Sequence, residues 1–119
     1  YSFSKFEATL RSIDIHESQV QTIDTNAFAN LYHLEKLVLW GNKLTSVPSE
    51  WFANLGNLRI LDLSFNKINQ IDYRVYYSLP YLNSFNIANN QLKTIDFSLF
   101  GLMTQLKTAR FGNNPLLWT

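Results

Sequence analysis

Cysteine is missing from the 119-residue sequence. Its absence excludes disulfide bonds, thiolate zinc sites and a cysteine nucleophile. It leaves the compartment open, because a reducing cytosol and a segment cut from between two disulfide-bonded caps both fit. No asparagine stands in an Asn-x-Ser/Thr sequence, so N-linked glycosylation is not expected.

Charge and long apolar runs are also scarce. Charged residues make up 16%, and ten Lys and Arg against nine Asp and Glu give a net charge of +1. This balance predicts no nucleic-acid partner. No apolar run reaches the roughly 18 residues of a membrane span, so no membrane insertion is expected. Hydrophobic residues make up 46%, which suits one domain, and the start at Tyr1 indicates a processed chain or a piece of a larger protein.

One sequence pattern recurs four to five times along the chain. The stretch LEKLVLWGNKL returns after 24 residues as LRILDLSFNKI and again as LNSFNIANNQL, and a backward shift gives LRSIDIHESQV. An incomplete copy, LKTARFGNNPL, follows. The predicted repeats of this single domain span residues 10–33, 34–57, 58–81 and 82–105, with 1–9 as the end of a preceding repeat (Phe3 and Phe6 being its apolar residues) and 106–119 as a last partial repeat or the start of a C-terminal cap.

The apolar columns of the repeat predict how it folds. Positions 4 and 6 are apolar in every copy, so a strand there points both side chains into a core and exposes positions 3 and 5. One copy cannot bury its own apolar columns, whereas stacked copies can, because each column then contacts its counterparts above and below.

The pattern L-x-x-L-x-L-x-x-N-x-L resembles the leucine-rich-repeat signature over residues 10–116, and the 24-residue period resembles its typical extracellular subclass. The resemblance implies an α/β solenoid, a curved arc with a parallel concave sheet of about five strands and an irregular or 3₁₀ convex side. The sequence of the repeats is similar to that of an ectodomain segment of a Toll-like receptor or an arthropod immune leucine-rich-repeat protein.

Three polar or aromatic columns have structural interpretations. Position 9 carries Ser18 and then asparagines, whose amides can satisfy backbone groups where each strand turns away, with Ser18 as a shorter and looser rung. Asp24, Asp72 and Asp96 at position 15 are expected to cap the convex segments, where Pro48 also fits. The aromatic residues at position 19 are expected to form a buried spine.

Catalytic and metal motifs are not found. Neither His16 nor His33 has a second histidine at metal-ligand spacing, and no G-x-S-x-G, P-loop or G-x-G-x-x-G sequence occurs. Asp14 and Asp62 stand two copies apart, about 9–10 Å, which is near the spacing of an inverting glycosidase, but nothing else of such a site is visible. We therefore expect no enzyme activity, no metal and no cofactor.

The exposed strand positions of a curved solenoid form its natural docking face. Large apolar groups in the middle rows are expected to face water, with charged or polar groups around them, which is a signal of a protein partner. Trp51, on the convex side, is expected to be partly buried packing. The predicted protein-binding residues are Trp40, Phe65, Val38, Ile60, Asp62, His16, Lys36, Asn86 and Arg110.

These observations favour a non-enzymatic protein-binding module that uses its concave face, as a recognition segment of an extracellular or cell-surface innate-immune or receptor protein. The alternatives are an adhesion or matrix protein that pairs homotypically, and a structural scaffold segment. FGNNPLLWT resembles the start of a C-terminal cap but has Leu116 in place of tryptophan and Trp118 where the first cysteine would fall. Two accounts therefore stay open: a fragment of a longer ectodomain that contacts flanking domains at the solenoid ends, and a short homodimer paired through those ends.

Overall fold

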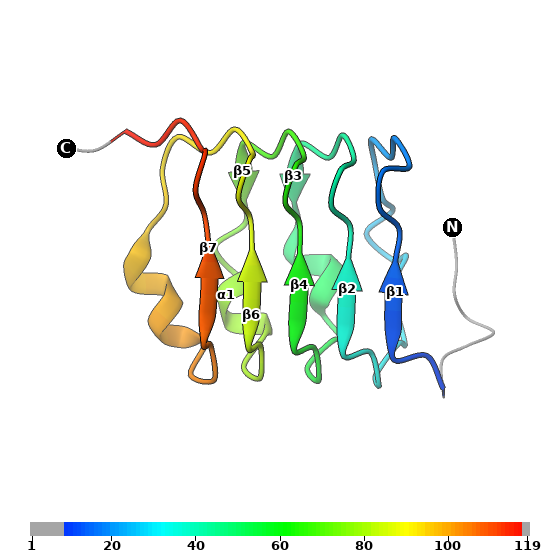
Figure 1. Ribbon diagram of the computed structural model, residues 1–119. Helices are drawn as coiled ribbons and strands as arrows, with labels where there is room; N and C mark the ends of the chain where they lie inside the picture. The colour runs from blue at the N-terminus through cyan, green and yellow to red at the C-terminus, as the bar shows by residue number, and fades with distance from the viewer. Residues whose placement is uncertain (1–8, 118–119) are drawn as a thin grey trace.

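The computed structural model describes residues 9–117 and shows a stack of coils with one main sheet on the side nearest the viewer in Figure 1. Five parallel strands form this sheet in the order β1-β2-β4-β6-β7. They are β1 (Ser12–Asp14), β2 (Lys36–Val38), β4 (Ile60–Asp62), β6 (Ser84–Asn86) and β7 (Thr108–Arg110). Phe3, Phe6 and Trp118 lie outside the described residues.

The register of the sheet follows the sequence period. Ile13 lies opposite Leu37, which lies opposite Leu61, so partners on neighbouring strands are 24 residues apart in the chain. The same offset continues through Phe85 to Ala109. Residues at one repeat position are therefore spatial neighbours, and the predicted α/β solenoid with a five-stranded parallel sheet is confirmed.

The opposite side of the stack is built from short segments, seen behind the sheet in Figure 1. They are β3 (Ser46–Val47) and β5 (Gln70–Ile71), which pair in parallel, the 3₁₀ helices η2 (Ser49–Phe52) and η3 (Phe97–Leu102), and the short helix α1 (Val75–Ser78). The aspartate column caps this side as predicted. The Oδ1 atoms of Asp24, Asp72 and Asp96 each accept the backbone N–H two residues further on, at 2.8–3.0 Å.

The core lies between the two sides. Position 4 buries Ile13, Leu37, Leu61 and Phe85, and the aromatic column buries Phe28, Phe52 and Tyr76. Trp51 is more deeply buried than expected. Its ring packs edge-on against Phe28, and its Nε1–H donates to the carbonyl oxygen of Ile23 on the preceding coil, at 3.3 Å. This hydrogen bond satisfies the one polar atom of a buried indole.

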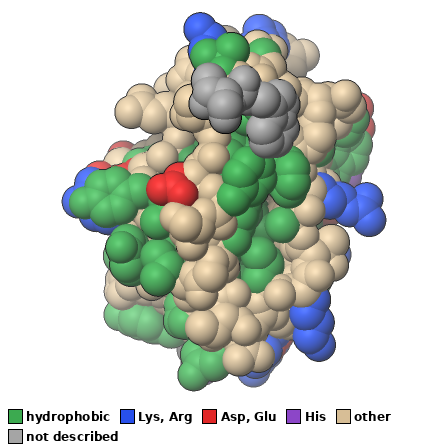
Figure 2. All heavy atoms as spheres, turned by 90° about the vertical axis from the view of Figure 1, so that its left-hand side faces the viewer, with side chains coloured by type: hydrophobic (Ala, Val, Ile, Leu, Met, Phe, Trp, Pro, Cys, Tyr) green, Lys and Arg blue, Asp and Glu red, His purple; other side chains and the backbone are tan. Residues whose placement is uncertain are grey.

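Hydrophobic side chains are visible across the C-terminal end of the stack (Figure 2). Residues of the last coils that fill buried columns elsewhere are only partly buried here: Leu99, Phe100, Leu106, Phe111 and Leu116. No following coil covers them within residues 9–117. Pairing through the solenoid ends stays a prediction.

A ladder of asparagine side chains runs through the stack beside the sheet. Asn42, Asn66 and Asn90 are buried. The amide nitrogen of Asn66 donates to the carbonyl oxygens of Leu39 and Leu63, both at 3.0 Å, and its Oδ1 accepts the N–H of Leu44 at 3.1 Å. Each rung thus bonds its own coil and the preceding one, as the predicted structural role requires. Among the described residues, the hydroxyl of Ser18 donates only within its own coil, to His16.

Replacing Asn66 by alanine tests this ladder. The substitution strands buried N–H and C=O groups of two coils, each at a cost of about 1–3 kcal/mol, so we expect the free energy of unfolding to fall by about 3 kcal/mol or more. The matched control is Asn69→Ala, because Asn69 is exposed on the same coil. Its effect in urea unfolding should stay within about 0.5 kcal/mol. Equal losses in the two variants would contradict the role of the ladder.

Candidate protein-binding surface

The sheet face is the exposed surface formed by repeat positions 3, 5, 7 and 8. Of the residues predicted to bind a partner there, Lys36, Arg110 and His16 are exposed, as are Ile60 and Phe65, while Trp40, Asp62 and Asn86 are partly buried. No ion pair joins Lys36 or Arg110 to another residue in the part of the chain that the structure describes. Within the described residues, the sheet face therefore offers two cations without an ion-pair partner and two exposed apolar groups.

The expectation that Val38 faces water is wrong. Only 6% of this residue is exposed. Val38 is paired in register with Asp14 on one side and Asp62 on the other, and Trp40 lies two residues further along the same face. The short side chain of Val38 extends less far from the sheet than the side chains of these neighbours, which shield it from water. Ile60 and Phe65 are five residues apart, about 16 Å along an extended strand, so the exposed apolar groups form separate spots.

Two polar residues of the sheet face already accept hydrogen bonds from groups of their own coil. The Oδ1 atom of Asp62 accepts the N–H of Ser64 at 3.0 Å and its hydroxyl at 2.6 Å. The Oδ1 atom of Asn86 accepts the N–H of Ala88 at 3.0 Å. These local bonds hold the chain at the ends of β4 and β6 and leave fewer lone pairs for a partner.

The most unusual residue of the sheet face is Phe65. It stands at position 8, where every coil has a left-handed backbone: Glu17 (φ 49°), Gly41 (φ 75°), Phe65 (φ 54°), Asn89 (φ 59°) and Asn113 (φ 57°). Glycine and asparagine adopt this conformation readily, whereas a bulky side chain is strained in it by the order of 1–3 kcal/mol. Phe65 is also 58% exposed, so burial compensates little of that strain.

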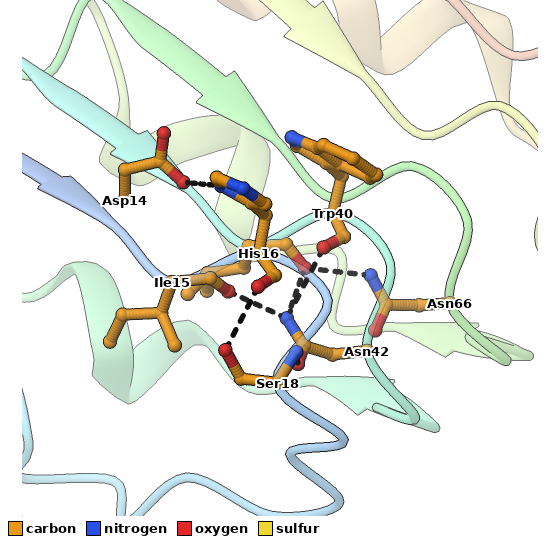
Figure 3. Close-up of polar contacts among 8 residues, drawn as sticks. Asp14, Ile15, His16, Ser18, Trp40, Asn42 and Asn66 are labelled. Carbon is orange, nitrogen blue, oxygen red and sulfur yellow. Dashed lines mark hydrogen bonds and ion pairs between the residues drawn. The ribbon is translucent and has the colours of Figure 1, made fainter.

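Asp14, His16 and Trp40 form a second distinctive group, at the N-terminal end of the sheet face (Figure 3). The imidazole of His16 lies parallel to the indole of Trp40, with ring centroids 4.8 Å apart. Its Nδ1 is 2.6 Å from Oδ1 of Asp14. This hydrogen bond raises the pKa of His16 above its ordinary value, and the negative charges of Asp14 and Glu17 add to the effect.

Asp14 and His16, together with Ser18 two residues further on, are the three side-chain types of a hydrolase triad. The hydroxyl of Ser18, however, donates to the carbonyl oxygen of His16 at 2.9 Å and is not directed at the imidazole. A serine nucleophile needs its hydroxyl hydrogen-bonded to the base, so these residues do not assemble a triad. No cluster of three His, Cys, Asp or Glu side chains suited to a metal ion occurs in residues 9–117.

Two features were not predicted from the sequence, although a comparison of residues at the same repeat position indicates both. His16 and Trp40 both occupy position 7 of consecutive copies, so the period alone places them side by side. Gly41, Asn89 and Asn113 share the column of Phe65 and signal a left-handed turn there. A third missed feature lies on the opposite side, where exposed Tyr73 and Tyr77 pack edge-on with centroids 6.3 Å apart.

The strain at Phe65 predicts that Phe65→Asn stabilises the protein. Asparagine at the equivalent position of the next coil, Asn89, adopts the same backbone conformation. We expect the free energy of unfolding to rise by about 0.5–1 kcal/mol in urea titrations. Phe65→Ala is the matched control, since it removes the ring but keeps the strained β-carbon, and should change little. A stability loss in both variants would show that the ring has a structural role and would contradict the prediction.

Comparison with known proteins agrees with this architecture. A domain of APL1B is 25% identical with a TM-score of 0.86, and the match covers 98% of this chain and 35% of that one. Toll, in the Toll–Spatzle complex of Drosophila, is 26% identical with a TM-score of 0.82, covering 91% of this chain and 16% of Toll. The protein LIC12759 of Leptospira interrogans is 30% identical with a TM-score of 0.79, covering 88% and 26%.

The chain thus spans about a third or less of each of these structures. Its predicted resemblance to Toll is confirmed, and no curated protein sequence matches the chain. Every helix within residues 9–117 is too short or too polar to cross a bilayer. The sequence model described as leucine rich repeat matches residues 8–68, 32–92 and 57–116, which together span nearly the whole chain. The chain therefore belongs to the leucine-rich-repeat family, whose members are typically non-enzymatic protein-interaction modules.

Proposed function

We propose that this chain is a protein-binding segment of an extracellular recognition protein and that it holds its partner on the sheet face. The observation that carries the proposal is the strained backbone and the solvent exposure of Phe65. A residue that is both strained and solvent-exposed weakens the folded chain, and such residues concentrate at ligand-binding sites. Contact with a partner is a reason to keep an aromatic ring at this position.

Other residues of the sheet face fit such a contact. Ile60 on the same coil is 38% exposed, Trp40 lies on the preceding coil, and Lys36 and Arg110 are charged groups without an ion-pair partner among residues 9–117. Aromatic anchors surrounded by polar groups are typical of interface hot spots. The extracellular assignment and the innate-immune role are supported by the similarity to Toll, whose structure was determined with Spatzle.

A homotypic adhesion protein is the second candidate. A second copy would remove from water the apolar residues of the last coils that no following coil covers within residues 9–117, such as Phe100 and Phe111. Sedimentation velocity separates the two candidates. Self-association that Phe65→Asn leaves unchanged points to the solenoid end, whereas a wild-type monomer favours a different partner.

The proposal predicts that partner retention depends on Phe65. Immobilised wild-type chain, Phe65→Asn and Tyr73→Asn would be exposed to secreted proteins of the source tissue, and the retained proteins identified. Tyr73 is the matched control, because it is exposed to a similar degree on the opposite side. We expect a protein held by the wild type and by Tyr73→Asn whose affinity for Phe65→Asn is about 30-fold lower, the loss of one hot spot. Equal retention by all three would contradict a docking role of the sheet face.

A further inference from the structure

The stack of His16 on Trp40 follows directly from the register of the sheet. Both residues occupy position 7, and neighbouring strands are about 4.8 Å apart, so two flat rings that stand upright there meet face to face. The observed centroid distance of 4.8 Å with an interplanar angle of 0° matches this spacing. Few other positions of the sheet face combine two rings in this way, because Ser64, Ala88 and Gly112 follow in the same column.

Asp14 decides how the imidazole is protonated. A carboxylate only accepts hydrogen bonds, so the 2.6 Å contact requires the proton of neutral His16 to lie on Nδ1. Protonation then adds the second proton at Nε2, which has no hydrogen-bond partner in the described chain. The resulting imidazolium is paired with Asp14 at its edge and lies against the indole at its face, where a cation is attracted by the ring quadrupole.

Within residues 9–117, few other charges act on this group. Glu17 follows on the same coil, and its carboxylate favours the protonated form together with Asp14. On the neighbouring coil, the charged side chain of the sheet face is Lys36, four residues before Trp40 and about 13 Å away along the strand. Asp62 lies one coil further and is bound to Ser64. The local charge therefore changes mainly through His16.

We propose that Asp14 and His16 form a pH-dependent clamp on Trp40, which holds the indole in its orientation more firmly when His16 is protonated than when His16 is neutral. The chemistry of the clamp depends only on these residues, while its consequence for a partner rests on the proposed function. A fixed indole loses less conformational freedom on binding than a mobile one, so contacts through Trp40 are tighter at mildly acidic pH.

The sign follows from the direction of the shift. The Asp14 hydrogen bond raises the pKa of His16, so the charged form of the stack is fully present below the ordinary imidazole pKa of about 6.5. It is lost as pH rises through the higher pKa of the folded state. The window of change is therefore between about pH 6.5 and the pH just above the raised value.

Nuclear magnetic resonance of the free protein tests the clamp without any partner. The Trp40 indole N–H and the His16 ring would be followed from pH 5 to pH 9. We expect the indole resonance to shift in one step with the midpoint of His16, above 6.5. Asp14→Asn should lower that midpoint and His16→Gln should remove the step, whereas His33→Gln should leave it in place. Unchanged side-chain amide resonances of Asn66 would confirm that the variants keep the fold.

An indole resonance that does not change over this range, or a step that disappears in His33→Gln, would overturn the proposal. A partner identified through Phe65 supplies a second readout. Its affinity at pH 6 should exceed that at pH 8 by about two- to fivefold for the wild type, and the ratio should approach one for His16→Gln. The titration of the free protein and the partner assay are separate, so failure of the clamp and failure of the proposed function can be distinguished.

Discussion

One side-chain amide in each coil after the first holds the stack together, because it satisfies the backbone where the strand turns away from the sheet. Asn42, Asn66, Asn90 and Asn114 donate to carbonyl oxygens of their own coil and of the preceding one, and accept an N–H from the preceding coil. In the buried rungs Asn42, Asn66 and Asn90 these groups are shielded from water, and no regular secondary structure pairs them. The amide can do so only if consecutive coils stand in the same register. The hydrogen bonds that the backbone needs at each turn are therefore formed only when the apolar columns are stacked.

The register in turn determines the surface. Residues 24 apart become lateral neighbours, so the sheet face is a grid whose columns are repeat positions and whose rows are coils. A ring in one row contacts a ring in the next, as His16 and Trp40 do. A left-handed turn at position 8 recurs in every coil, and this backbone conformation favours glycine and asparagine over other side chains. An aromatic residue at such a position stands out from the glycine and asparagine of its column.

Much of this was predictable because it depends on period alone. The asparagine rungs, the aspartate caps and the buried aromatic column each follow from one residue type recurring at one position, and the structure confirms all three. Surface exposure was harder to predict, because it depends on the relative heights of neighbouring side chains. Val38 is in a strand position that faces outward, yet Trp40 and two aspartates leave it little access to water. The strain at Phe65 needed the backbone angle, which a column of glycine and asparagine only suggests.

The side-chain amide protons of the asparagines provide the most direct measurement of the central claim. Hydrogen exchange followed by nuclear magnetic resonance can compare Asn42, Asn66 and Asn90 with the exposed Asn69. If the ladder holds consecutive coils in register, the amide protons of the three buried rungs exchange far more slowly than those of Asn69, and at rates close to those of the backbone amides in the sheet. Equally rapid exchange of all four would place the rungs in water and contradict both the ladder and the sheet face built on it.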